Sequence, residues 1–176
     1  PNKTQFAVSQ AICDLRKSLP FPLLGLDSDN GSEFINDTLY RYCLSDQITF
    51  TRSRPYQKND QAHVEQKNWS VVRHTVGYDR LETREELALL SSIYSDLRLY
   101  INFFQPVLKL ISKQRVDGKV IFTYDLATTP FRRVLALDSI PVHIKARLTE
   151  QYFHLNPVAL RSSIDSKVAL LWKIVR

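Results

Sequence analysis

The sequence predicts an α/β protein in which a small α/β core is followed by a mixed module of helices and a hairpin. Three observations support this fold class. The first is a strand, helix, strand order over residues 23–26, 36–44 and 48–51. The second is a series of amphipathic segments whose apolar residues recur at helical spacing. The third is a change of character after Pro106, where two short apolar segments flank a turn-forming pair. Together they predict one principal domain with a smaller module attached to it.

The first half of the expected core begins with an amphipathic helix over residues 2–19. Pro20 and Pro22 end this helix, because proline cannot continue the hydrogen-bond pattern. The wholly apolar run 23–26 that follows is typical of a strand covered on both faces. A second helix is expected over 36–44.

The second expected strand covers residues 48–51, where β-branched and aromatic side chains alternate. A helix separates it from the strand at 23–26, and such a crossover places the two strands side by side in parallel. Turn-forming residues fill positions 27–31, directly after the first strand. Asp29 is therefore expected at the carboxyl edge of the sheet, where α/β proteins expose functional side chains.

A helix is also expected over residues 61–76, with Glu65 on its first turns. At 100° per residue, Trp69, Val72 and Val76 lie within about 40° of Glu65, which predicts that they share an inward face. The opposite face carries His63, Lys67 and His74. These two histidines are without nearby cysteines, which favours exposed side chains over a zinc site.

The next expected helix follows Thr83 and Glu86, which form the pattern of a capping box. It should run to about Asn102. Phe103 and Phe104 continue its apolar stripe and are interpreted as core residues, not as a platform on which bases stack. The residues expected to be buried along the stripe are Leu87, Leu90, Tyr94, Leu97 and Ile101.

The module beyond Pro106 should open with a β-hairpin. Segments 107–113 and 119–124 flank Asp117 and Gly118, a pair that favours two-residue hairpin turns. Helices are then expected over 128–137, 144–152 and 157–172. The expected division of the chain is a core over 1–104 and a basic module over 105–176.

Charge is distributed unevenly along this chain of 176 residues with net charge +6. Residues 1–51 hold four Lys or Arg against six Asp or Glu, whereas residues 105–176 hold twelve against five. Basic surfaces attract polyanions, and neutralised phosphates supply the sequence-independent part of DNA affinity. Scattered basic residues that only keep the protein in solution are the alternative interpretation.

Two further features of the composition bear on the environment of the protein. Cys13 and Cys43 each lie in an apolar helical pattern, which predicts reduced core residues and a cytoplasmic protein. No apolar run approaches the roughly 18 residues that would span a membrane. The first residue is Pro1 and not methionine, which predicts a fragment of a longer product.

Two sequence blocks carry a resemblance to a known family. They are DSDNGSEF, at 27–34, and RPYQKNDQAHVEQKNW, at 54–69, and they contain Asp29 and Glu65 with 35 residues between the two acids. In combination they resemble the second and third catalytic blocks of the DDE integrase and transposase superfamily, especially insertion-sequence transposases with an integrase core. The interval between the acids is similar to that of the family. The resemblance covers most of the chain and weakens after about Asp125.

The resemblance implies a truncated ribonuclease H-like core that lacks the first strands. Family members cut and join DNA by in-line attack on a phosphodiester, using two divalent ions and three carboxylates. Asp29 and Glu65 correspond to the second and third carboxylates, so the resemblance makes them catalytic residues and ligands of Mg²⁺ or Mn²⁺. The first aspartate has no counterpart. Asp14 lies on the outside of the expected first helix and Asp27 is too close to Asp29, so neither replaces it.

The function implied by the resemblance is that of a transposase or integrase fragment. The full-length protein would cleave and transfer DNA strands as a homo-oligomer on element ends and target DNA, in the bacterial cytoplasm, and the fragment alone would be inactive. A non-catalytic DNA-binding or assembly remnant of a decayed mobile element is the alternative, and an unrelated ribonuclease H-like nuclease is a third. DNA contacts are expected from Arg52, Arg54, Lys58, Lys67, Arg73, Arg132, Arg133, Lys145 and Arg147.

Overall fold

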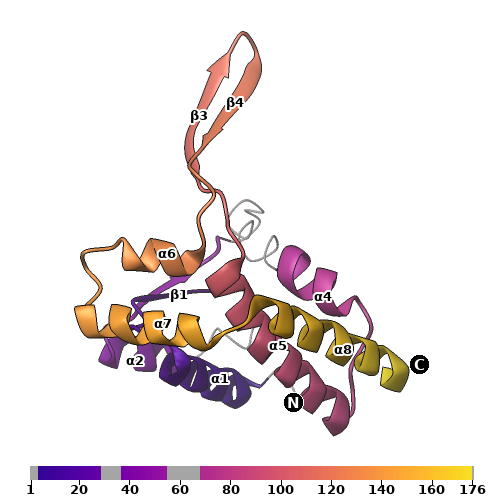
Figure 1. Cartoon of the computed structure of the whole chain (residues 1–176). Coiled ribbons are helices and arrows are strands. Elements are labelled where there is room, and N and C mark those ends of the chain that lie inside the picture. The colour runs from indigo at the N-terminus through magenta and orange to yellow at the C-terminus, as the bar shows by residue number, and fades with distance from the viewer. Residues whose placement is uncertain (1–3, 29–36, 55–67, 176) are drawn as a thin grey trace. The chain divides into compact units, whose positions relative to one another are not determined.

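The computed structural model describes residues 4–28, 37–54 and 68–175 (Figure 1). These residues form a mixed α/β protein in which helices predominate over two small sheets, so the predicted α/β class is confirmed. The chain divides into two compact units, Pro1–Gly77 and Tyr78–Arg176.

The first unit contains the predicted strand, helix, strand order. Its first four elements are α1 (Gln5–Ser18), β1 (Gly25–Ser28), α2 (Asp37–Ser45) and β2 (Thr49–Arg52). The strands β1 and β2 pair in parallel, with Gly25 opposite Thr49 and Ser28 opposite Arg52. The pairing predicted from the crossover is therefore confirmed, although both strands lie one or two residues further along the chain than expected.

Apolar residues from both helices cover this parallel pair. The buried cluster consists of Ile12, Leu39, Cys43 and Ile48, against which Leu26 and Phe50 pack from the strands. Cys43 is buried as predicted, and burial raises the pKa of its thiol, with a smaller contribution from Asp46. Cys13 is half-buried. This cluster covers the face of the pair that carries Leu26 and Phe50, whereas Asp27, Thr49 and Thr51 are exposed.

The first unit ends in an irregular helix. A π-helical segment, η2 (Asn68–Arg73), passes into one α-helical turn, α4 (His74–Val76). Gly77 closes this turn with a φ of 74°, a left-handed conformation that glycine adopts without strain. Val76 is buried, as the face count predicted.

The prediction of an inward Trp69 is wrong, because 58% of the Trp69 side chain is exposed. Its ring contacts His74 edge-on, with 4.4 Å between ring centroids. Residues five apart lie on different sides of an α-helix, but the i to i+5 hydrogen bonds of a π-helix bring them together. The count at 100° per residue fails for this reason. His74 is exposed as predicted, whereas Glu65, His63 and Lys67 lie outside the described residues.

The second unit consists of helices and one hairpin. Its elements are α5 (Arg84–Phe104), β3 (Leu110–Val116), β4 (Lys119–Tyr124), α6 (Pro130–Leu135), α7 (Val142–His154) and α8 (Pro157–Val175). The predicted capping box of α5 is confirmed: the Thr83 hydroxyl accepts a bond from the Glu86 backbone N–H, and the Glu86 carboxylate accepts one from Thr83 N–H at 2.8 Å. Backbone hydrogen bonds from Thr83 and Glu82 hold the pKa of Glu86 below its usual value.

Aromatic side chains form a buried cluster in the second unit, and Phe103 and Phe104 belong to it as predicted. Phe103, Phe131 and Leu148 are buried, and the ring of Tyr152 stacks on Phe131 with 5.0 Å between centroids. Phe104 packs against this cluster. These rings therefore hold α5, α6 and α7 together.

The buried stripe of α5 differs in part from the prediction. Leu97 is buried as expected, but Leu87 is 40% exposed. Glu86 occupies the inward position on that turn, because its carboxylate closes the capping box. The expected stripe residues Leu90, Tyr94 and Ile101 are half-buried.

A polar contact joins α5 to α8. The carboxylate of Asp96 accepts hydrogen bonds from Lys167 Nζ at 2.6 Å and from Ser163 Oγ at 2.7 Å. Because α5 packs along α8, it belongs to the second compact unit, whose boundary follows Gly77. The sequence had predicted a division after residue 104.

The predicted hairpin at Asp117 and Gly118 is confirmed. Both residues have positive φ, 48° and 80°, which is the conformation that a two-residue hairpin turn requires. β3 and β4 pair antiparallel, with a bulge between Leu110 and Ser112. Figure 1 shows this hairpin extending away from the helices of its own unit.

Candidate active site

Hydrogen bonds at the carboxyl ends of β1 and β2 hold these ends together. The Ser28 carbonyl accepts bonds from the Ser53 N–H at 3.0 Å and from the Ser53 hydroxyl at 3.3 Å. Both serines are buried. Within the paired strands, Thr51 Oγ1 donates to Asp27 Oδ1 at 2.7 Å, and these two residues are register partners. The two strands therefore end at the same edge of the sheet.

Both predicted acidic residues belong to segments that start from this edge. Asp29 is the residue directly after β1, and the chain leaving β2 passes through Ser53 and Arg54 towards Glu65. Asp29 and Glu65 themselves lie outside the described residues. The two segments that contain these acids therefore begin at the same edge of the β1–β2 sheet.

The donor set of these two acids suits a hard divalent cation. Carboxylate oxygens are the ligands that Mg²⁺ prefers, and this ion keeps several of its own waters. Asp27, at the same edge, already accepts the Thr51 hydroxyl. Asp14 is exposed on α1, where its carboxylate accepts hydrogen bonds from Gln10 and Lys17. Over 4–28, 37–54 and 68–175, no group of three or more His, Cys, Asp or Glu residues could hold a metal ion.

The basic residues predicted to contact DNA have different environments in the first unit. Arg52 and Arg54 are exposed at the carboxyl edge, where a bound polyanion could reach them. Lys58 and Lys67 lie outside the described residues. Arg73 is half-buried and donates a hydrogen bond to the Gly77 carbonyl at 3.3 Å, so it stabilises the end of its own helix.

In the second unit, three of the predicted DNA-binding residues lie on the surfaces of short helices. Arg132 is exposed on α6 and Arg147 is exposed on α7, while Lys145 is half-buried.

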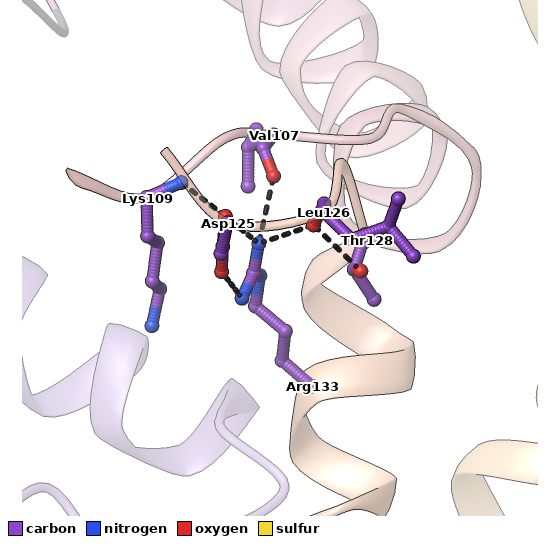
Figure 2. Close-up of polar contacts among 6 residues, drawn as sticks. All are labelled: Val107, Lys109, Asp125, Leu126, Thr128 and Arg133. Carbon is purple, nitrogen blue, oxygen red and sulfur yellow. Dashed lines mark hydrogen bonds and ion pairs between the residues drawn. The ribbon is translucent and has the colours of Figure 1, made fainter. Parts of the chain in front are cut away.

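The fourth, Arg133, is engaged within the protein (Figure 2). Its guanidinium pairs with Asp125 through Nη1 at 2.5 Å and Nη2 at 3.1 Å, and Nη2 also donates to the Val107 carbonyl at 2.8 Å. Both members of this pair are about three-quarters buried. Asp125 in turn accepts the Lys109 backbone N–H at 2.7 Å. Arg133 is thereby the anchor of the hairpin base to α6.

Electrostatics at this anchor favour a charged carboxylate. The hydrogen bonds from Arg133, and then the one from the Lys109 backbone, hold the pKa of Asp125 below its usual value. Arg133 was predicted to contact DNA because a sequence does not distinguish isolated charges from paired ones. The signal it lacked is spatial, since Asp125 and Val107 meet Arg133 only once the hairpin has formed.

Sequence reasoning also missed a set of exposed residues on the hairpin. Cross-strand partners in an antiparallel pair lie on one face. On one such face Arg115 is opposite Val120, Lys113 is opposite Phe122, and Leu110 is opposite Tyr124. The sequence pattern that could have predicted this face is a pair of cations at 113 and 115 before the turn and a pair of aromatic residues at 122 and 124 after it, each pair two residues apart.

Comparison with known proteins gives similarity to an uncharacterized protein. No protein-family model matches the sequence. Over 126 residues, 72% of this chain, the sequence is 45% identical to the uncharacterized protein y4rM of Sinorhizobium fredii (strain NBRC 101917 / NGR234). The match covers 36% of that protein, so the chain spans about a third of the length of its relative. In the described part of the chain, no helix has both the length and the apolar character needed to cross a membrane.

Proposed function

We propose that this chain is the C-terminal part of a DDE-type transposase or integrase core, in which Asp29 and Glu65 bind a divalent metal ion. The observation that carries the proposal is the parallel pairing of β1 and β2. It gives the segments bearing the two acids a common starting edge, and the sequence blocks around the acids resemble the catalytic blocks of that superfamily.

The residues at the edge have defined tasks in this proposal. Asp29 and Glu65 would supply the carboxylate oxygens that hold Mg²⁺ or Mn²⁺, and the bound ions would activate and stabilise the oxygens of the phosphodiester that is attacked. Arg52 and Arg54, exposed at the carboxyl end of β2, would neutralise DNA phosphates. The Ser28 to Ser53 and Asp27 to Thr51 bonds fix the strand ends and so position the segments that follow.

A metal-binding measurement tests the acidic pair without requiring catalysis. We expect Mn²⁺ to bind the chain, and Asp29→Asn and Glu65→Gln each to weaken that binding by at least about tenfold, since loss of even an outer-shell partner costs that much. Asp14→Asn and Asp46→Asn are matched controls, because Asp14 accepts hydrogen bonds from Gln10 and Lys17 and Asp46 pairs with Arg16; both should bind Mn²⁺ like the unaltered chain. Titration calorimetry gives the affinities. Equal affinity in all four variants would refute the assignment.

Activity is expected only where a third carboxylate is present. The two acids cannot supply the ligands of two ions, so the chain alone should not nick DNA. A longer form that adds an aspartate-bearing strand ahead of Pro1 should show Mg²⁺-dependent nicking that either substitution abolishes. Cleavage by the chain alone, or full activity in either variant, contradicts the proposal.

The second candidate function is a non-catalytic DNA-binding protein. The exposed basic residues of the second unit favour it, because they do not depend on a metal site. DNA binding that persists in both metal-site variants, combined with absent nicking in the longer form, would support this candidate over the enzyme. The first proposal also includes homo-oligomer formation and a cytoplasmic, nucleoid-associated location. Both are implied by the resemblance of the sequence to the DDE integrase and transposase superfamily.

A further inference from the structure

The side chains of the β3–β4 hairpin are almost all exposed to solvent. All six residues of β4 and six of the seven residues of β3 are exposed. The exposed side chains include large apolar ones: Leu110, Ile111, Val116, Val120, Ile121, Phe122 and Tyr124. An isolated two-stranded hairpin is marginally stable at best in water, and large exposed apolar patches mark interaction sites. This hairpin therefore has the character of a contact surface.

The charge of the hairpin indicates the kind of partner. Between Leu110 and Tyr124 there are three cations, Lys113, Arg115 and Lys119, and one carboxylate, Asp117 at the turn. Within the part of the chain that the structure describes, none of the three cations forms an ion pair. The other acidic residue near the hairpin, Asp125, is paired with Arg133 at the base. The exposed portion is thus positive and suits a polyanion.

One face combines these cations with aromatic rings. Lys113 Nζ lies 5.6 Å from the centroid of the Phe122 ring, and Phe122 stacks on Tyr124 with 6.5 Å between centroids. Arg115 lies on the same face, opposite Val120. Because the Phe122 ring already packs against Lys113 and Tyr124, it cannot act as an open platform for an unstacked base. The face therefore suits the backbone and groove of a duplex better than a single strand.

We propose that the β3–β4 hairpin is an arm that binds duplex DNA through the face carrying Lys113, Arg115, Phe122 and Tyr124. The major groove admits a two-stranded β-ribbon, and seven residues of strand extend about 24 Å. Lys113 and Arg115 contact phosphates, while the apolar side chains contact sugars and the methyl groups of thymine. The contact to phosphates makes the binding largely independent of sequence.

A second copy of this chain is a poorer occupant. Two hairpins meeting face to face would bring the Lys113 and Arg115 side chains of each copy together, and like charges in contact are unfavourable. The bulge between Leu110 and Ser112 also interrupts the outer edge of β3, which reduces strand pairing with a neighbour.

Binding to a duplex of about two turns, roughly 21 base pairs, tests this arm in fluorescence anisotropy with EDTA present. We expect Lys113→Gln with Arg115→Gln to weaken binding by about tenfold or more at low salt, and to reduce the slope of log affinity against log salt by about two. Arg98→Gln with Lys173→Gln is the matched control, because both side chains are exposed on helices of the same unit. The control should bind with nearly unchanged affinity and slope.

A second variant separates loss of contact from loss of the hairpin. Phe122→Leu keeps an apolar side chain but removes the ring, and it should weaken duplex binding while circular dichroism of the chain stays unchanged. Equal loss of affinity in the Gln pair and in the control pair, or tighter binding to a single strand of the same length, overturns the proposal. The proposal is also overturned if the variant with Lys113→Gln and Arg115→Gln binds duplex DNA with unaltered affinity but sediments differently without DNA. That result would assign the face to contact with a second copy of the chain.

This inference deepens the proposed function by naming a surface for its DNA partner, yet its test is separate. Asp29→Asn and Glu65→Gln should not change duplex affinity in EDTA, because no metal is then bound. Loss of Mn²⁺ binding without loss of DNA binding, or the reverse, therefore distinguishes which of the two proposals has failed.

Discussion

The described residues contain two sheets of two strands each, and the two sheets are stabilised differently. The parallel pair β1–β2 has its apolar side chains packed under α1 and α2, with Leu39 fully buried. The antiparallel pair β3–β4 has almost no buried side chain and is held at its base by the ion pair between Asp125 and Arg133. Parallel strands need a crossover connection, and the crossover helix packs on the sheet and covers it. Antiparallel strands can be joined by a two-residue turn, which covers nothing. The covered sheet therefore suits the positioning of a site, and the uncovered one suits contact with a partner.

The largest expected effect comes from removing cover over the parallel pair. Leu39→Ala should lower the free energy of unfolding of the chain by about 2–5 kcal/mol, because it leaves a cavity in the buried cluster. Leu44→Ala changes the same residue type on the same helix, but Leu44 is 63% exposed, so its effect should stay within about 0.5 kcal/mol. Urea unfolding followed by circular dichroism compares the two. Similar losses in both variants would mean that α2 does not cover the sheet as described.

An intermediate and local effect is expected at the anchor of the hairpin. Arg133→Ala removes the guanidinium that bonds both Asp125 and the Val107 carbonyl, so exchange of the Lys109 and Asp125 backbone amides should accelerate by about tenfold or more. Arg132→Ala, at the exposed neighbouring position, should leave these rates unchanged. Hydrogen exchange followed by NMR measures both. Unchanged exchange in the Arg133 variant would show that the hairpin base does not depend on the ion pair.

The smallest expected effect is a difference between the sheets in acid. The native pKa of Asp125 lies below its usual value, so its stabilising contribution is fully present above the unfolded pKa of about 3.9 and is lost as pH falls through the lowered native value. The Lys109 amide, bonded to this carboxylate, should shift in NMR spectra in that range. The Thr49 amide of the parallel pair donates to the backbone carbonyl of Leu24, so its signal should shift much less in the same range. Asp125→Asn should abolish the Lys109 titration, and a titration that persists would contradict the assignment.

Local patterns predicted the features that depend on neighbours in the sequence. The hairpin follows from Asp117 and Gly118, which tolerate positive φ, and the start of α5 follows from Thr83 and Glu86. The parallel pair follows from the general handedness of crossovers. In these three cases the decisive interactions lie within a few residues, or obey a rule of topology, so the sequence was sufficient.

Features that depend on distant partners or on unusual backbone were not predictable. Trp69 was placed inward because an α-helical period was assumed, whereas the π-helical turn brings it beside His74. Arg133 was assigned to DNA, although its guanidinium is held by Asp125 across the base of the hairpin. For the candidate active site, the sequence placed Asp29 at a strand end, and the structure places the end of β1 beside that of β2; the acids themselves lie outside the described residues.

The base of the hairpin has a consequence for how this region can change in length. Val107 and Thr128 exchange two backbone hydrogen bonds, at 3.1 and 3.2 Å, so the chain leaves α5 and returns towards α6 at nearly the same point. The residues between Val107 and Thr128 therefore form a loop whose two ends are bonded to each other. Lengthening such a loop costs little free energy, because the entropy of loop closure grows slowly with length. Pairs of residues can be added to or removed from the two strands without displacing either helix. The reach of the hairpin can therefore change without a change in the aromatic cluster of α5, α6 and α7.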